Sequence, residues 1–274
     1  MKRNRGAEKM DIQIQSITNP KVKQWMKLLS KKGRKQQNKF LVEGAASVME
    51  AVQADVSAVD CIVYSADRGM PESLKQAAKH VPRYAVSEAV LKKCTDAVTP
   101  QSVFAVVRQP EADISRLIHP QSLVVVCDGI QDPGNLGTII RSADAAGATG
   151  VLVSPDSVDV YHPKVVRSTM GSLFHLPVIV TGLAEALAEA AAQGIHAWSA
   201  KPKAEVSLYE ADFREASWFI IGNESAGISP EVEQCAANSL YIPMEGKAES
   251  LNAAMAATIM LFEAMRQRMA NSFD

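Results

Sequence analysis

Six short apolar segments in the second half of the chain, each followed by a helical pattern, constrain the fold most strongly. They lie at 122–128, 150–154, 177–181, 195–199, 218–222 and 239–243. The run Leu123-Val-Val-Val-Cys127 is apolar at every position, whereas a strand with one face in solvent would alternate. Such strands are typical of a parallel sheet covered by helices on both faces. We therefore predict an open, parallel-sheet α/β domain in this half.

The first half shows a shorter version of the same alternation. A helix is expected to begin at Asn19-Pro20 and to bury Trp25. Beyond it, strand-like runs at 40–44, 59–64, 83–86 and 103–107 alternate with helical patterns at 45–54, 72–79 and 87–94. We predict a basic, flexible segment at 1–15, a smaller α/β sandwich at 16–109, a linker at 110–120 and the larger domain at 121–274.

Composition excludes several classes of protein. No apolar segment approaches the roughly 18–20 residues that span a bilayer, and no apolar core follows the charged start as in a signal peptide. Four scattered cysteines have neither metal-ligand spacing nor the density of a disulfide scaffold. We expect a cytoplasmic protein with reduced cysteines, no membrane segment and no metal site.

The net charge of −1 hides a strong bias along the chain. Residues 1–39 contain 12 Lys or Arg and 2 Asp or Glu, whereas the remaining residues contain 17 and 28. By itself, such a basic run is either a solvated face or tail, or a surface that binds nucleic-acid phosphates. The candidates for phosphate binding in this run are Lys31, Lys32, Arg34 and Lys35, and Lys164 and Arg167 can extend the track on a later helix.

Three polar, glycine-containing turns, at 128–137, 222–229 and 242–252, accompany strand candidates of the larger domain. Ligands of open α/β sheets bind outside the carboxyl ends of the strands, so a binding site is expected where these turns meet. The first turn lacks both the lysine of a P-loop and the G-x-G-x-x-G spacing of a dinucleotide site. Asn223 stands where a nucleophile elbow needs its first glycine, so Ser225 is not expected to be a nucleophile.

The candidate residues in these turns also have structural interpretations. Asn135 and Ser250 are good N-caps for the helices that follow them. Glu224 can be a helix-start carboxylate before a helix at 228–237, and a lone helical Arg141 is usually solvated. The residues alone leave these alternatives open.

Together, however, the turns resemble a known family. The segments NLGTIIRSADAAGA at 135–148, GNESAGIS at 222–229 and IPMEGKAESLN at 242–252 are similar, in order, to the three motifs of the SpoU (TrmH-type) RNA ribose 2'-O-methyltransferases of the SPOUT superfamily. The segment KVVRSTMGSLFHLP at 164–177 also resembles this family, so the similarity spans 122–268. The segment FLVEG at 40–44 resembles the RNA substrate-binding domain that many members carry, which is related in fold to a ribosomal protein.

The resemblance implies a trefoil-knotted C-terminal domain that binds S-adenosylmethionine, and a homodimer with composite sites. It implies a cofactor pocket formed by Gly222, Ile242 and Leu251. It further implies a polar catalytic set, which consists of Asn135, Arg141, Glu224, Ser250 and Asn252.

The implied reaction moves a methyl group from a sulfonium to a ribose hydroxyl, which requires positioning and loss of a proton but no metal. A guanidinium is effectively always charged, so we expect Arg141 to bind phosphate and stabilise the developing alkoxide rather than act as a base. Ribosomal RNA is the expected substrate by analogy, with transfer RNA as the alternative. A non-catalytic RNA-binding or ribosome-assembly factor is the competing function, and an NAD-dependent enzyme is disfavoured.

Overall fold

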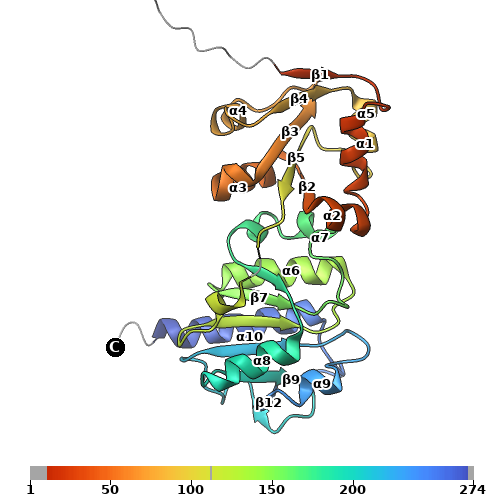
Figure 1. Cartoon of the computed structure of the whole chain (residues 1–274). Coiled ribbons are helices and arrows are strands. Elements are labelled where there is room, and N and C mark those ends of the chain that lie inside the picture. Colours follow the sequence, from red (N-terminus) through yellow and green to blue (C-terminus); the bar gives the residue numbers. More distant parts are fainter. Residues whose placement is uncertain (1–10, 112, 271–274) are drawn as a thin grey trace, which may run out of the picture. The chain divides into compact units, whose positions relative to one another are not determined.

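The computed structural model of the chain describes residues 11–111 and 113–270 (Figure 1). It divides into two compact units, an N-terminal unit at Met1–Gln109 and a C-terminal unit at Pro110–Asp274. Each unit contains its own sheet. In the part of the chain that the structure describes, no helix is long and apolar enough to cross a membrane.

The N-terminal unit contains a five-stranded mixed sheet in the order β1-β4-β3-β5-β2. Its strands are β1 (Ile12–Ile14), β2 (Lys39–Glu43), β3 (Val59–Ser65), β4 (Arg83–Val86) and β5 (Val103–Arg108). Its helices are α1 (Pro20–Lys27), α2 (Lys31–Gln37), α3 (Ala45–Asp55), α4 (Glu72–Ala77) and α5 (Glu88–Lys93), with a 3₁₀ turn η1 (Val56–Ala58) after α3. α1 and α5 flank the sheet on one side and α3 and α4 on the other (Figure 1), as predicted for an α/β sandwich.

The first helix shows why the sequence forms this layer. Asn19 caps α1 by accepting a hydrogen bond from the Lys21 N–H at 2.8 Å, and Pro20 supplies a helical φ at the first position. Trp25 lies 3% exposed in the core, edge-on to Tyr84 and Phe104, as expected for a core residue.

The C-terminal unit contains a seven-stranded sheet in the order β10-β12-β9-β11-β6-β7-β8, in which every pairing is parallel. Its strands are β6 (Leu123–Cys127), β7 (Gly150–Val153), β8 (Val178–Val180), β9 (His196–Ala200), β10 (Val206–Ser207), β11 (Ser217–Ile221) and β12 (Asn238–Tyr241). Its helices are α6 (Pro133–Ala145), α7 (Pro163–Ser168), α8 (Leu183–Ala192), α9 (Pro230–Glu233) and α10 (Ala253–Ala270), with 3₁₀ turns η2 (Ile114–Leu117) and η3 (Ser172–Phe174).

Both faces of this sheet are buried, which confirms the prediction drawn from the apolar runs. Val125 and Phe219 pack into one core with residues of α6 and α10. Val124 and Trp218 pack into a second core with residues of α8. A strand between two such layers is apolar at every position because neither face meets solvent.

The strand order reverses at the centre of this sheet. From β6 the chain adds β7 and β8 on one side, and then places β11, β9 and β12 on the other. Loops that follow strands on the two sides of such a switch point diverge and leave a crevice for a ligand. The trefoil knot that the resemblance implies stays a prediction.

Several elements differ from the expectations. The basic run forms helix α2 and the predicted flexible segment includes strand β1, while residues 1–10 of that segment lie outside the described part. The segment predicted as a linker, 110–120, contains the 3₁₀ turn η2, whose Leu117 is fully buried in the second core of the C-terminal unit. The helix expected at 228–237 is reduced to the single turn of α9.

Candidate active site

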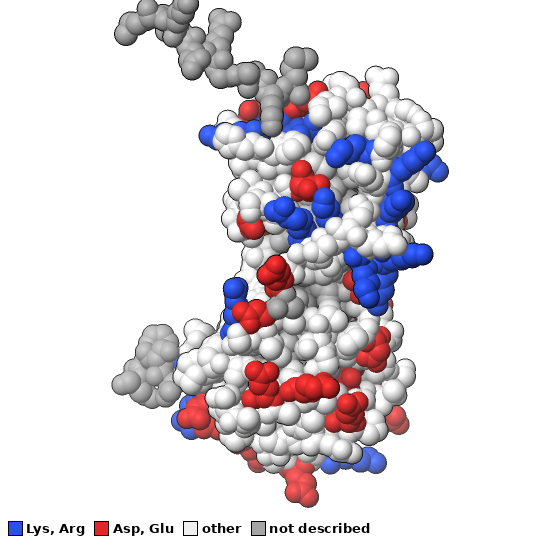
Figure 2. Space-filling view, viewed as in Figure 1, with Lys and Arg blue, Asp and Glu red and all other residues white. Residues whose placement is uncertain are grey.

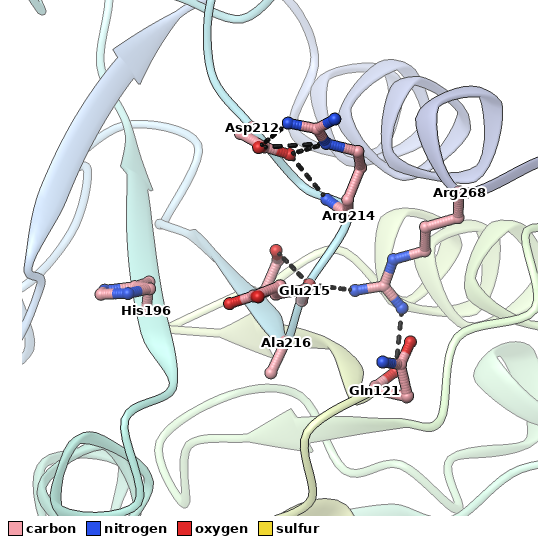
Figure 3. Close-up of a pocket in the computed structure, with 8 residues that line it drawn as sticks. Gln121, His196, Asp212, Arg214, Glu215, Ala216 and Arg268 are labelled. Carbon is pink, nitrogen blue, oxygen red and sulfur yellow. Dashed lines mark hydrogen bonds and ion pairs between the residues drawn. The ribbon is translucent and has the colours of Figure 1, made fainter. Parts of the chain in front are cut away.

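Two cavities of the C-terminal unit lie at opposite edges of its sheet. The larger, of about 630 Å³, lies where β6, β9 and β11 begin (Figure 3). Both of its arginines have partners: Arg214 forms an ion pair with Asp212, and Arg268 donates to backbone carbonyls. We therefore assign it a structural role.

The second cavity, of about 450 Å³, lies where β9, β11 and β12 end. This volume lies in the range of about 300–1,000 Å³ that is usual for small-molecule sites. Six of the eight predicted catalytic and cofactor-binding residues line it: Gly222, Glu224, Ile242, Ser250, Leu251 and Asn252. The turns at 222–229 and 242–252 thus converge on one site, because the strands that precede them, β11 and β12, both lie next to β9.

A chain of hydrogen bonds links the three turns. The Glu224 carboxylate accepts a bond from Asn135 Nδ2 at 2.8 Å, and Asn135 Oδ1 accepts one from Asn252 Nδ2 at 3.0 Å. Asn252 Oδ1 in turn accepts bonds from the backbone N–H groups of Ala254 and Met255. An ionised carboxylate only accepts, so Glu224 sets the orientation of both amides. We call these three residues the amide relay.

The environment of Glu224 keeps its carboxyl group charged. Partial burial acts to raise its pKa, but the hydrogen bond from Asn135 and those from backbone N–H groups, including that of Gln131, outweigh burial and lower the pKa below its usual value. The relay therefore contains a carboxylate at neutral pH.

The structure corrects two predicted helix caps. Asp132, not Asn135, caps α6, because its carboxylate accepts the Asn135 N–H at 2.9 Å. Asn252, not Ser250, accepts the first free N–H groups of α10. The alternative interpretation of Asn135 and Ser250 as helix caps is therefore wrong, and the functional interpretation of both residues remains. Ser250 is exposed at the cavity and has no hydrogen bond among the described residues.

Asn223, which the sequence suggests as a possible ligand-binding group, and Asp128, which it does not single out, hold the turns in place. Asn223 Nδ2 donates to the Gly129 carbonyl at 2.7 Å, and Asn223 Oδ1 accepts the N–H groups of Ser225 and Ala226. The buried Asp128 carboxylate accepts the Ser229 N–H at 2.6 Å. The available signal was the preference of Asn and Asp for turns, which gives no indication of their long-range partners.

Gly222 has a structural role as well as a place in the cavity wall. A Cβ atom at this position would lie 2.4 Å from the backbone of Gly227, so only glycine fits between the two arms of the turn. The turn folds back on itself through reciprocal backbone hydrogen bonds between Asn223 and Gly227.

Arg141 lies apart from the amide relay of its own chain. It follows Asn135 by six residues of α6, which places it about 120° away around the helix axis. Its side chain is exposed and makes no hydrogen bond or ion pair within the described residues. Within one chain, Arg141 is not brought into the cavity.

The predicted phosphate-binding residues fall into three groups. Lys31, Lys32 and Lys35 project from α2 as exposed side chains. Arg34 requires a correction: it is 2% exposed and donates to the Leu28 carbonyl at 2.8 Å, so it closes the α1–α2 corner instead of facing solvent. On α7, Lys164 is exposed and lies 3.8 Å from Asp132, while Arg167 is half-buried.

No group of three or more His, Cys, Asp or Glu side chains suited to a metal ion occurs within residues 11–111 and 113–270. Three cysteines are buried and free, and burial raises the pKa of Cys61 and of Cys94 to about 12. Neither thiol is poised as a nucleophile.

Comparisons with known proteins agree with this geometry. Residues 122–262 match the model of the SpoU rRNA Methylase family, and residues 19–105 match that of the MRM3-like substrate binding domain. The chain is 36% identical over 250 residues to the 23S rRNA (guanosine(2553)-2'-O)-methyltransferase RlmP of Bacillus subtilis (strain 168), which covers 91% of this chain and 98% of that protein.

Two further similarities extend over almost the whole chain. The 23S rRNA (uridine(2479)-2'-O)-methyltransferase of Streptomyces viridochromogenes is 34% identical over 280 residues, which covers 98% of this chain and 97% of that one. The crystal structure of the SpoU methyltransferase AviRb from the same organism, in complex with the cofactor AdoMet, superimposes with a TM-score of 0.85 at 34% identity and covers 92% and 99% of the two chains. Because the family model spans half of the sequence and these relatives match along its length, the chain belongs to the SpoU rRNA Methylase family.

Proposed function

We propose that the chain transfers a methyl group from S-adenosylmethionine to the 2'-hydroxyl of a nucleotide in 23S ribosomal RNA. The observation that carries the proposal is the amide relay, which joins Glu224, Asn135 and Asn252 from three turns at the edge of one cavity. Membership of the family confirms the predicted class of enzyme and its cofactor. The choice of RNA rests on relatives that are named for 23S rRNA and match over 90% of this chain. We also propose that the activity is cytoplasmic, because a bacterial ribosomal RNA is found there.

The cavity suits this cofactor. Apolar side chains such as Ile242 and Leu251 offer a surface for a flat heterocycle, and the turn at 222–229 presents backbone groups to its polar atoms. When bound, S-adenosylmethionine supplies an electrophilic methyl group on a positive sulfur. We assign Gly222, Ile242 and Leu251 to the binding of this cofactor.

The chain's own polar residues would position the ribose and assist loss of its proton. The relay holds the amides of Asn135 and Asn252 in one orientation before substrate arrives, which lowers the cost of aligning the reacting atoms. The Ser250 hydroxyl lies at the same cavity, has no hydrogen-bond partner in the described part of the chain, and can hydrogen-bond the sugar. Arg141 remains charged throughout, so its assigned role is to bind the neighbouring phosphate and stabilise the developing alkoxide.

We further propose that two copies form a homodimer with composite sites. Arg141 points away from the relay of its own chain, so a site with both needs Arg141 from a second copy. On α10, Met255, Phe262 and Met269 are 56%, 40% and 53% exposed at intervals of seven residues, which places them on one stripe. An exposed apolar stripe of this kind is suited to pack against another subunit.

Complementation tests the composite site. Arg141→Ala and Asn252→Ala are each expected to be inactive as homodimers. A mixed dimer would regain one complete site, formed by the relay of one chain and the arginine of the other. If co-expressed, differently tagged chains purify as a mixed dimer without recovered methyl transfer, then Arg141 acts in its own chain or not at all.

RNA binding is assigned to a lysine surface on α1 and α2 of the N-terminal unit. No acidic residue occurs between Asp11 and Glu43, and the exposed lysines of the surface are Lys21, Lys23, Lys27, Lys31, Lys32 and Lys35. Basic side chains gather over these helices in Figure 2. The C-terminal unit contains 10 Lys or Arg against 20 Asp or Glu, so a polyanion should bind chiefly through the other unit and local cations such as Lys164 and Arg167.

Calorimetry with S-adenosylmethionine is the first test of the activity. Saturable binding that Leu251→Trp abolishes would locate the cofactor in the cavity. Leu251 is preferable to Gly222 because substitution of Gly222 would break its turn. Mapping of 2'-O-methyl groups in ribosomal RNA from a deletion strain then tests the substrate. A well-folded protein that binds 23S rRNA but not the cofactor would instead be a non-catalytic RNA-binding factor, and a lost mark in transfer RNA would reassign the substrate.

A further inference from the structure

Met170 combines two features that the fold does not explain. Among the described non-glycine residues, only Asn38 and Met170 have a positive φ, each of 52°. Met170 directly follows Thr169, the C-cap of α7, where chains commonly adopt this left-handed conformation but use glycine or asparagine. Its side chain is 64% exposed, so burial does not compensate for the unfavourable backbone.

Contacts of α6 place this turn beside Arg141. Four residues before Arg141, a Cβ atom on Gly137 would lie 2.4 Å from the Ser168 Cβ, so α7 ends directly against this part of α6. Three residues after Arg141, Asp144 Oδ2 is 2.7 Å from His175 Nδ1. Residues at these intervals share a helix face, so the segment from Ser168 to His175, which contains Met170, runs alongside Arg141.

We propose that Met170 is a specificity-determining residue that packs against a nucleobase next to the methylated ribose. The inference rests on the proposed function and goes beyond it by assigning a base contact. Arg141 would hold the phosphate while the exposed thioether side chain, which is flexible and polarizable, lies against the adjacent base. A strained residue with an exposed apolar side chain is expected where function, not stability, selects it.

The surroundings favour RNA over a second protein chain as the occupant. Arg141 on α6 and Arg167 in the last turn of α7 lie near this turn, and Lys164 begins the same helix α7. The exposed apolar stripe of α10 is on another helix. Charged side chains are depleted from the centres of protein interfaces, while cations beside an apolar contact suit a phosphate and its base.

Three substitutions of Met170 separate the effect of its backbone strain from that of its side-chain contact with the base. Met170→Gly removes both the strain and the side chain. Met170→Asn tolerates the left-handed conformation but presents a polar group, and Met170→Leu keeps an apolar side chain. Binding of each variant to a 23S rRNA transcript is measured by filter retention, together with methyl transfer, the urea midpoint and the dimer dissociation constant.

Met170→Gly is expected to unfold at the same or a higher urea concentration than wild type, yet to bind the transcript about tenfold more weakly. Met170→Asn should resemble it, and Met170→Leu should recover most of the affinity. Unchanged RNA affinity in Met170→Gly would overturn the proposal, and a weakened dimer with unchanged RNA affinity would assign the side chain to the subunit interface. Because binding is measured directly, lack of methyl transfer by the wild type would refute the proposed function without deciding the base contact.

Discussion

Replacement of Arg268 by Met should destabilise the C-terminal unit without affecting cofactor binding. Arg268, in the last turn of α10, donates to four backbone carbonyls at 2.6–3.2 Å: those of Gln121, Ser122, Phe213 and Glu215. Figure 3 shows the bonds to Gln121 and Glu215. The guanidinium thereby fastens α10 to the segments just before β6 and β11. Methionine preserves much of the aliphatic stem and removes every donor.

The expected loss of unfolding free energy follows from the kind of hydrogen bond and its exposure to water. A hydrogen bond from a charged group contributes about 1.5–3 kcal/mol, but four bonds to one guanidinium are not additive. Water at the cavity can replace part of the lost bonding, so we expect a loss of about 3 kcal/mol, equivalent to two such bonds. Arg268→Lys should recover about 1 kcal/mol of this, because an ammonium lacks the planar fork of donors.

Urea unfolding followed by tryptophan fluorescence measures this loss. Trp198 and Trp218 both report on the C-terminal unit, and a Trp25→Phe background removes the signal of the other unit. Arg214→Met is the matched control, since Arg214 lines the same cavity but, within the described residues, bonds only to nearby Asp212. This substitution should cost less than about 1 kcal/mol. A loss below about 1 kcal/mol for Arg268→Met, or a large change in cofactor affinity at the opposite edge, would refute the reasoning.

Three further predictions follow from contacts and charges. Gly137→Ala gains about 1 kcal/mol of helix propensity but meets Ser168, so chemical denaturation should show a net loss of about 1–2 kcal/mol that Ser168→Gly partly relieves. The pKa of Glu224 is lowered in the folded protein, so its stabilising effect is complete above the unfolded pKa near 4.5 and disappears as pH falls through the folded pKa. The difference in unfolding free energy between wild type and Glu224→Gln should therefore shrink only in acid. A difference that shrinks near neutral pH would contradict this. The triple substitution of Lys31, Lys32 and Lys35 by Ala should reduce the slope of log RNA affinity against log salt concentration by about 2. An unchanged slope would mean that these exposed lysines do not contact RNA.

The structure also changes how the basic segment is best tested. Deletion of residues 1–39 would remove α1, whose Trp25 is part of the core of the N-terminal unit. Weaker RNA binding by such a deletion would then report unfolding as much as lost charge. Substitution of exposed lysines separates the two effects, because these side chains contribute little to packing.

The sequence by itself determined the alternation of strands and helices, because side chains on buried strands and amphipathic helices follow the periods of those elements. All six strands predicted for the larger domain are present, while the two-residue β10 was too short for periodicity to reveal. The sequence also determined the family, because the three motifs are short local segments whose residues and order can be read without the structure.

Only the tertiary structure decided what individual polar residues do. Arg34 and Lys35 are neighbours in the same basic run, yet the α1–α2 corner buries Arg34 and leaves Lys35 exposed. The amide relay joins positions 135, 224 and 252, and its hydrogen bonds exist only after the parallel sheet brings the three turns to one edge. Strain at Met170 likewise depends on a backbone angle, which the identity of the residue does not reveal. Local periodicity specifies which face of an element is apolar, whereas pairing between distant side chains is set by how the elements pack.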